Sequence, residues 1–510
     1  MTILRGAKSL AGFPPGLYIN ELAVPQSDDT ATSDFVLGFV GEFDRGPVNQ
    51  YVMISETPSK RLAEIAAPIL GLTTTTAKGN ALLDHLDRAR VKKAVFARVL
   101  GAGYATASIT LKDRQATPAD TLKVSPKAGP GTYANIFTVE VQDGTTAGTF
   151  KLILGSDIGG METYDNLSMD TADARFAEKV VNAASEHFIV TDMKSAAATR
   201  AQAIPAVKAK TQLTGGSNGA VLTDADRIGT VDSGTGVRTG LKLLELVGNV
   251  VSDVAFIDYS SAAADAALKV FGEKYNCMTY CGQGTANTVS AATAYRKTFD
   301  TDFMQMVYGR YKSVGGQWIS GACLSAIVHA IGNVEDSGLA IECPWIVGSD
   351  QGIDLDDYTT LYTNQIAAFQ LKPSAVGDGS LAWRMANDYT LALTDVAGDV
   401  IRDDENRKVN KRRLNSWIEK ALEAVAAPWQ GKALTKKMKD DAERRIRTFF
   451  DNLVKPVNPL ETSKIDAYSI TFDSKATAID QFVQNIKVKH YNTAEWILLN
   501  FQGGTNVEVK

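Results

Sequence analysis

The chain has 510 residues, more than one hydrophobic core usually supports, so we expect about three or four domains or subdomains. Hydrophobic residues make up 45% and charged residues 22%, which is typical of a folded protein and excludes a largely disordered one. The net charge of -5 gives no whole-chain basic field, so we expect no nucleic-acid partner.

The first residues, Met1 to Gly6, lack the long apolar core of a signal peptide, and no apolar run is long enough to cross a bilayer. We therefore expect a protein that is made and kept in the cytosol, without membrane insertion. Four cysteines in so long a chain do not make a disulfide framework, so we expect free, buried thiols.

An extended arm is predicted for residues 1–22, because the breaker cluster Pro14-Pro15-Gly16 interrupts regular structure. The run from Leu17 to Val24 then has the composition of a strand. Residues 23–100 form the next predicted part, with strands at Phe35 to Val40 and Ala94 to Val99 around helical patterns.

The middle of the chain divides into two predicted outer parts. In residues 101–212, short strand patterns are separated by Gly, Pro and Asp, which indicates a β-rich domain. The glycine-rich link from Leu213 to Gly219 marks a boundary. In residues 213–338, helix and strand patterns alternate, which favours an α/β domain rich in parallel strands.

Two amphipathic helices are predicted in the last large part, residues 339–490. The apolar face of the first comprises Val409, Leu414, Trp417, Ile418, Ala421, Leu422 and Val425. The second runs from Thr435 to Leu453, and its apolar face comprises Met438, Ala442, Ile446 and Phe449. Strand patterns follow at Tyr468 to Phe472 and at Ile486 to Lys489.

The final part, residues 491–510, contains the apolar, β-prone run from Trp496 to Phe501. A strand so close to a chain end stays ordered only when its own sheet or the sheet edge of a neighbouring molecule holds it. The sequence alone leaves both alternatives open.

No catalytic or metal-binding constellation emerges from the chemically active residues. The four histidines are far apart and none has ligand spacing. Cys277 and Cys281 lack the two-residue spacing of a metal or redox pair, which favours two buried neighbours. There is no Gly-x-Ser-x-Gly elbow for a hydrolase.

Two loops could be binding sites, and each is compared with the alternative that it is an ordinary loop. The segment from Gly234 to Gly240 looks like a phosphate loop, but its spacing misses both glycine fingerprints. The acidic loop with Asp350, Asp354, Asp356 and Asp357 lacks EF-hand spacing, so a solvated turn is favoured over a Ca²⁺ site. We therefore predict no catalytic, cofactor or metal site.

Basic residues gather on both helices of the last part, at Lys411, Arg412 and Arg413 and again from Lys436 to Arg447. Such runs are more often solvated helix faces than binding sites. The alternative is a localised positive face that docks against a negatively charged partner.

Several motifs, in order along the chain, resemble the sheath proteins of contractile phage tails and related contractile injection machines. They are Pro15-Gly16-Leu17-Tyr18-Ile19, Phe35 to Gly41, Arg45-Gly46-Pro47-Val48, Leu213 to Gly219 with Leu222 to Gly229, and Val409 to Leu422. Together they span nearly the whole chain.

The resemblance implies a structural protein of a virion tail, assembled in the host cytoplasm, and not an enzyme. Such subunits form stacked hexameric rings around an inner tail tube, between a baseplate and a tail terminator, and contract to drive the tube through the cell envelope for genome delivery. An inner domain is built from both chain ends, here 23–100 and 339–490, with the outer domains inserted between them.

The resemblance also implies that both ends are arms that add strands to sheets of neighbouring subunits. The expected inter-subunit strand residues are Leu17, Tyr18, Ile19, Leu22, Trp496, Ile497, Leu498, Leu499 and Phe501. As tube-facing charges we expect Lys436, Lys437, Arg444 and Arg445 first, and Lys411, Arg412 and Arg413 second. Two alternatives are a cytosolic α/β enzyme with a nucleotide-type site in residues 215–331 and a non-contracting tube or shell protein.

Overall fold

The computed structural model describes residues 2–5, 18–21, 35–71, 78–156, 160–197, 199–284, 286, 288–374, 380–393, 407–456, 463–472 and 484–491. The chain divides into two compact units, Met1–Ile3 with Ser33–Arg413 and Leu4–Thr32 with Leu414–Lys510. Its several sheets and helices confirm the expected α/β and α+β multidomain class.

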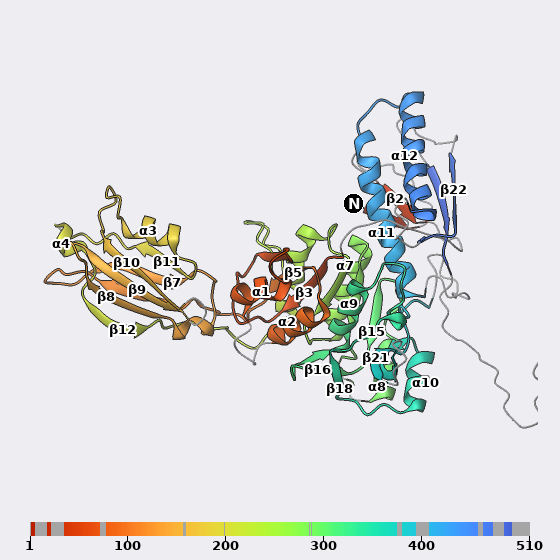
Figure 1. Cartoon of the computed structure of the whole chain (residues 1–510), viewed down its shortest axis with the longest axis horizontal. Helices are drawn as coiled ribbons and strands as arrows, with labels where there is room; N and C mark the ends of the chain where they lie inside the picture. The colour runs from red at the N-terminus through yellow and green to blue at the C-terminus, as the bar shows by residue number, and fades with distance from the viewer. Residues whose placement is uncertain are drawn as a thin grey trace, which may run out of the picture. The chain divides into compact units, whose positions relative to one another are not determined.

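A seven-stranded sheet lies at the centre of the first unit (Figure 1). In sheet order its strands are β19 (Ile366–Ala367), β15 (Met304–Val307), β14 (Met278–Cys281), β13 (Asp253–Phe256), β3 (Leu37–Gly41), β5 (Lys93–Arg98) and β4 (Tyr51–Ser55). All neighbouring pairs are parallel except β4 with β5, which are antiparallel. Successive side chains of a strand point to opposite faces, so Phe39 and Val40 enter two different cores.

Helices cover both faces of this sheet. The core that contains Phe39 is shared with α1 (Leu62–Leu70), α2 (Lys78–Ala89) and α9 (Gly321–Ile331). The core that contains Val40 is shared with α6 (Leu241–Leu244), α7 (Ala262–Tyr275), α8 (Val289–Arg296) and α10 (Leu355–Thr363). Both faces therefore need apolar side chains, which explains the almost uninterrupted apolar character of the strands.

The sheet corrects the predicted domain boundaries. Residues 23–100 and 213–338 were assigned to different domains, but they supply the neighbouring strands β3 and β13 of one sheet. Phe39 is paired with Ala255 in the parallel register. The two segments form one folding unit because their strands share two hydrophobic cores.

Smaller elements complete this α/β part. An antiparallel sheet contains β17 (Trp318–Ser320), β16 (Arg310–Ser313) and β18 (Ile346–Ser349), and a ribbon contains β20 (Phe369–Pro373) and β21 (Leu381–Met385). Short helices are α5 (Asp224–Ile228), η2 (Glu245–Val247) and η3 (Gly338–Ala340).

Residues 107–213 form a β-rich module in the same unit. One antiparallel sheet has the order β10 (Gly160–Leu167), β9 (Phe150–Ser156), β8 (Thr138–Asp143) and β12 (Lys208–Gln212). The other has the order β11 (Phe188–Asp192), β7 (Asp120–Pro126) and β6 (Ile109–Lys112). With α3 (Ala177–Ala184), the two sheets share one core. The remaining short elements are η1 (Thr132–Ile136) and α4 (Arg200–Ala203).

The second unit is built around two long helices and a ribbon. Helix α11 (Val409–Ala426) begins in the first unit and continues in the second from Leu414. After η4 (Ala427–Trp429) come α12 (Lys436–Val454) and the antiparallel pair β22 (Ala467–Phe472) and β23 (Gln484–Lys489). Near the N-terminus, β1 (Thr2–Arg5) and β2 (Tyr18–Glu21) form a two-stranded sheet.

Helix α12 follows its predicted pattern closely. The Thr435 hydroxyl caps its start by accepting a hydrogen bond from the Met438 backbone N–H at 3.2 Å. Its buried residues are Met438, Ala442, Ile446, Phe450 and Leu453. Phe450 is buried in place of the predicted Phe449, and its ring stacks on Tyr468 of β22 at 5.2 Å between centroids. The helix thus covers the ribbon.

Candidate functional site

The basic start of α11 is buried in the structure. Lys411, Arg412 and Arg413 are 3%, 2% and 3% exposed. The prediction that these three residues are secondary tube-facing charges is therefore wrong, because their side chains do not reach the surface. Cationic side chains are buried only when they are paired, so their partners define a site in the interior.

Arg413 forms a buried ion pair with Asp253, the first residue of β13. Its Nε lies 2.8 Å from Asp253 Oδ1 and its Nη2 lies 3.1 Å from Oδ2, so the contact is bidentate. Asp253 also accepts hydrogen bonds from the Tyr280 hydroxyl at 2.7 Å and the Ser252 hydroxyl at 2.7 Å. The guanidinium carbon lies 4.2 Å from the centroid of the Phe35 ring.

The protonation of this pair follows from its environment. Burial alone would raise the pKa of Asp253, but the charge of Arg413 and four hydrogen bonds hold it below its usual value. Burial, together with the Asp253 charge, raises the pKa of Tyr280 well above its usual value. At neutral pH the pair is therefore ionised and Tyr280 remains a hydrogen-bond donor.

Two further residues of the same helix start reach other segments. Arg412 lies 3.4 Å from Asp302 Oδ2, and its Nη2 donates to Asn276 Oδ1 at 3.3 Å. Asn410 Nδ2 donates to the Glu335 carbonyl at 3.0 Å. Polar contacts with three separate segments of the α/β part, at Asn276, Asp302 and Glu335, therefore hold the first turn of α11.

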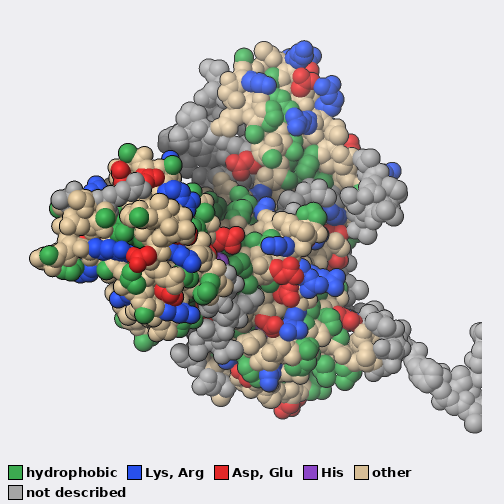
Figure 2. All heavy atoms as spheres, turned by 60° about the vertical axis from the view of Figure 1, so that its left-hand side comes forward, with side chains coloured by type: hydrophobic (Ala, Val, Ile, Leu, Met, Phe, Trp, Pro, Cys, Tyr) green, Lys and Arg blue, Asp and Glu red, His purple; other side chains and the backbone are tan. Residues whose placement is uncertain are grey.

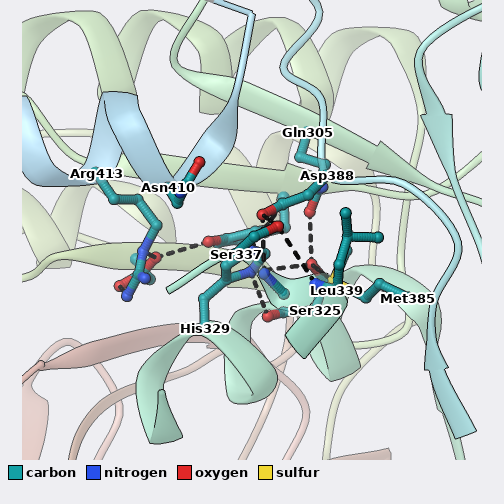
Figure 3. A network of polar contacts seen from close by, with 12 residues as sticks. Gln305, Ser325, His329, Ser337, Leu339, Met385, Asp388, Asn410 and Arg413 are labelled. Atoms are coloured by element: carbon teal, nitrogen blue, oxygen red, sulfur yellow. Dashed lines mark hydrogen bonds and ion pairs between the residues drawn. The ribbon is translucent and has the colours of Figure 1, made fainter. Parts of the chain in front are cut away.

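A second charge centre pairs His329 of α9 with Asp388, which follows β21 in the chain (Figure 3). His329 Nε2 is 2.9 Å from Asp388 Oδ1, and its Nδ1 is 2.9 Å from the Ser325 carbonyl. Both ring nitrogens therefore lie within hydrogen-bond distance of an oxygen atom. Asp388 also accepts from the Ser337 hydroxyl at 2.8 Å and the Gly338 N–H at 2.9 Å.

Burial alone would raise the pKa of Asp388, but the His329 charge and these hydrogen bonds hold it below its usual value. Its own backbone carbonyl accepts the Val409 N–H at 3.1 Å. The two charge centres therefore fix both Asp388 and the beginning of α11 to the sheet.

Ser325, His329 and Asp388 have the residue types of a hydrolase triad but not its arrangement. All three are at most 2% exposed, and the Ser325 hydroxyl donates to Gln305 Oε1 at 2.5 Å. Ser325 and His329 are one turn apart on the same helix, and Figure 3 shows the serine held within the network. A hydroxyl that is already bonded and buried is not a nucleophile that a substrate could reach.

The remaining sequence candidates also have structural roles. None of the four cysteines forms a disulfide, and all four are buried, as predicted. In the suspected phosphate loop, the Asp232 carboxylate accepts the backbone N–H groups of Gly234 at 2.9 Å and Thr235 at 2.7 Å. The groups that would bind a phosphate are thus occupied by an aspartate of the chain itself.

The acidic loop is a helix start. Asp354 caps α10 by accepting the Asp357 N–H at 2.8 Å, and Asp350 accepts the Arg310 N–H at 2.7 Å. Within the described ranges, no group of three or more His, Cys, Asp or Glu side chains is arranged to hold a metal ion. No helix in the described part of the chain combines the length and hydropathy that crossing a membrane requires.

The four first-ranked tube-facing candidates lie on one exposed stretch of α12. Lys436, Lys437, Arg444 and Arg445 are all exposed. Arg444 is 76% exposed and contacts only Asp441, at 2.5 Å, among the ion pairs of the described side chains. Figure 2 shows several Lys and Arg side chains, with Asp or Glu side chains near them, on the part of the surface that corresponds to α12 in Figure 1.

The expected arm strands are only partly within the described residues. Tyr18 and Ile19 belong to β2. Leu17, Leu22 and the run from Trp496 to Phe501 lie outside the described residues. Their pairing with a neighbouring subunit stays a prediction.

Sequence reasoning missed the partners of the basic cluster. The available signal was Asp253, a carboxylate that opens the otherwise apolar strand Asp253-Val254-Ala255-Phe256. An acidic residue at such a position is buried with the strand and requires a cationic partner. His329, in an otherwise apolar helix, was a second signal of the same kind.

The fold is similar to that of solved sheath proteins. Against the sheath tail protein of Desulfitobacterium hafniense, the TM-score is 0.55 with 14% identity over 92% of this chain and 99% of that chain. Against the sheath tail protein of Listeria innocua, the TM-score is 0.58 with 12% identity over 91% and 97%. Against the helical sheath of the anti-feeding prophage in its contracted state, the TM-score is 0.50 with 10% identity over 96% and 99%.

No family model and no curated protein sequence matches the chain. The likeness therefore lies in the fold: the chain has the fold of these two sheath tail proteins along nearly its full length and theirs.

Proposed function

We propose that this protein is the structural subunit of a contractile sheath. The observation that carries the proposal is the fold likeness to two sheath tail proteins, which extends over more than nine tenths of all chains compared. The similarity to a contracted sheath has the same full-length extent. A likeness limited to one α/β sheet would not support the sheath proposal, because α/β sheets occur in proteins of many unrelated functions.

In this proposal the subunits form stacked hexameric rings around an inner tube, between a baseplate and a terminator, in a virion tail or a related injection device. Contraction is a switch between two packings of the same subunits, with the extended form trapped behind a kinetic barrier after assembly on the tube. The work comes from new protein interfaces, so the subunit needs no catalytic site or cofactor.

The ribbon β22–β23 supports a role in strand exchange. Its register runs from Ala467 opposite Lys489 to Phe472 opposite Gln484, and neither strand pairs with a third strand among the described residues. A two-stranded sheet is marginally stable on its own, and a sheet can be extended by a further strand added at its edge. We propose that arm strands of neighbouring subunits, Leu17 to Leu22 and Trp496 to Phe501, add to these edges.

The exposed face of α12 supports contact with the tube. Lys436, Lys437, Arg444 and Arg445 form a localised positive surface on a chain of net charge -5. Such a surface can attach to an acidic partner and set its register without burying a large area. We therefore assign the tube contact to this face and not to the buried residues Lys411 to Arg413.

Deleting residues 494–510 tests the proposal. We expect the shortened protein to remain folded and soluble but to form no sleeves in electron micrographs. A variant that ends at Gln502 keeps the run from Trp496 to Phe501 and serves as the matched control, which should assemble. Normal sleeves from the 494–510 deletion would contradict the strand-exchange proposal.

Two further measurements address the alternatives. Micrographs of the assembled particle before and after triggering distinguish a sheath from a non-contracting tube, because only a sheath shortens and widens. A thermal-shift screen against nucleotides tests the enzyme alternative, and a saturable stabilisation by one nucleotide would contradict a purely structural role.

A further inference from the structure

The junction between the β-rich module and the α/β part is made of two chain crossings that pair with each other. The first crossing leads from β5 into the module and contains Gly101 and Ala105. The second leads from the module to α5 and contains Ser217 and Asn218. Ala105 N and Ser217 O are 3.0 Å apart, as are Ser217 N and Ala105 O. Gly101 N also donates to Asn218 O at 3.1 Å. Two hydrogen-bonded crossings resist bending more than two independent linkers do.

Arg98, the last residue of β5, lies at the base of these crossings and is 1% exposed. Its guanidinium donates to four backbone carbonyls. Three belong to the turn after β3, namely Phe43 at 3.0 Å, Asp44 at 3.0 Å and Gly46 at 2.7 Å. The fourth, Pro130 at 2.7 Å, belongs to the β-rich module.

Further contacts join the turn after β3 to the loop of the module that contains Pro130. Gly46 N donates to the Ala128 carbonyl at 2.8 Å, and the Arg45 guanidinium carbon lies 5.1 Å from the centroid of the Tyr133 ring. Gly129 has φ +87°, and a Cβ there would lie 2.7 Å from the Gly46 carbonyl oxygen. The turn Arg45-Gly46-Pro47, which the sequence marks as a motif, is thus one half of an interface.

The junction is polar. The buried hydrophobic cluster of the module contains only residues between Ala107 and Leu213, and neither of the other two clusters contains any of these residues. Among the described side chains, therefore, no shared apolar core fixes the orientation of the module. That orientation depends on the crossings, on the hydrogen bonds of the Arg98 guanidinium and on the contacts that Arg45 and Gly46 make with the module.

We propose that Arg98 is a positioning residue that locks the β-rich module onto the α/β part, so that the two turn as one rigid body. The lock needs a guanidinium, because only arginine offers five donors in a fixed plane to acceptors on different sides. The inference does not depend on the sheath function. Within a sheath it means that rearrangements between packings take place outside this junction.

Spin labels on two rigid helices test the proposal. Cysteines introduced at the exposed positions Lys179 of α3 and Ala266 of α7 report the distance between the module and the α/β part. The four native cysteines are buried and free, so the introduced ones should label selectively. We expect one narrow distance distribution in the otherwise unchanged protein.

Arg98→Met should broaden this distribution and speed proteolysis of the two crossings, while circular dichroism stays native. Arg98→Lys should be intermediate, because an ammonium donates fewer hydrogen bonds. Arg444→Met, at an exposed position, is the matched control and should leave the distribution narrow. A label pair within the α/β part, at Ala266 and Thr360, should not respond to any variant.

Two results would overturn the proposal: a broad distribution with Arg98 intact, or a narrow one in folded Arg98→Met. If Arg98→Met does not fold, Gly131→Ala perturbs the lock from the module side, since its Cβ would lie 2.8 Å from Arg98 Nη2. A narrow distribution in that variant would equally contradict the lock. None of these outcomes bears on sleeve formation, so failure of the lock and failure of the sheath proposal are distinguishable.

Discussion

Arg413 and Asp253 are 160 positions apart in the chain, yet their side chains form a bidentate contact of 2.8 and 3.1 Å in the interior of the first unit. One residue lies near the beginning of α11, and the other opens a central strand of the seven-stranded sheet. The pair therefore connects the beginning of α11 to the seven-stranded sheet, in which β13 lies beside β3.

The first prediction concerns this pair. Arg413→Met leaves the Asp253 carboxylate buried without its cation, so we expect a loss of about 3–5 kcal/mol in the free energy of unfolding. The double variant Asp253→Val with Arg413→Met removes both charges and should be much less destabilised. Chemical denaturation of the single and double variants measures both effects.

The matched control is Arg444→Met on α12, which is exposed and should change stability by less than about 0.5 kcal/mol. If the double variant is as unstable as the sum of its two single variants, the residues do not act as a pair. That result would contradict the anchoring role of the contact.

The second prediction concerns the pH dependence of stability. Asp265 of α7 is fully buried and accepts hydrogen bonds from Ser260 at 2.5 Å and Tyr295 at 2.6 Å, both through Oδ2. Its Oδ1 has no hydrogen-bond partner among the described residues. Burial, with a smaller contribution from the Asp224 charge, raises the pKa of Asp265 from 3.8 to about 7.

The sign follows from proton binding. Between about pH 4 and pH 7 the unfolded chain releases the Asp265 proton while the folded chain keeps it, so the folded state loses stability as the pH rises. Asp265→Asn removes this titration. Relative to the unchanged protein, its stability should therefore increase from pH 4 to pH 8, by at most about 4 kcal/mol. A difference in unfolding free energy that is the same at both pH values would contradict the raised pKa.

The third prediction concerns attachment to the tube. Replacing Lys436, Lys437, Arg444 and Arg445 by Glu should abolish cosedimentation with isolated inner tubes while the subunit stays folded, because all four side chains are exposed. Attachment of the unchanged protein should weaken as salt rises, since exposed charge pairs are screened beyond about 8–10 Å.

The matched control reverses four exposed lysines elsewhere, Lys92, Lys179, Lys210 and Lys297. It changes the net charge by the same amount, so attachment should persist if the location of the charges matters. Equal loss of attachment in both variants would show a general charge effect. Salt-insensitive attachment would contradict the electrostatic contact itself.

Local patterns in the sequence predicted local structure well. The apolar spacing of Met438, Ala442 and Ile446 and the cap at Thr435 predicted α12, because both signals depend on neighbours within one or two turns. The predicted apolar face included Phe449, which is half-buried, whereas its neighbour Phe450 is fully buried. The two rings differ by one position, and packing on Tyr468 from a later strand decides which of them is buried.

Non-local pairing could not be predicted from these patterns. No local signal places β3 beside β13, since parallel strands need a long crossover connection, and here the partners are more than two hundred residues apart. For the same reason Arg412 and Arg413 read as solvated charges: their acidic partners, Asp302 and Asp253, are more than a hundred residues away. The charged start of α11 is therefore an internal anchor, and of the two basic clusters only that of α12 is exposed and stays a candidate for contact with the tube.

Negative-stain electron microscopy of the purified full-length protein tests the central proposal most directly. The protein is imaged alone and in the presence of the inner tube. In at least one of these two conditions, a contractile sheath subunit should form hollow, helically ordered sleeves whose lumen is wide enough for the tube. Monodisperse single subunits under all these conditions, or filaments without a lumen, would contradict the proposal that this chain is a sheath subunit.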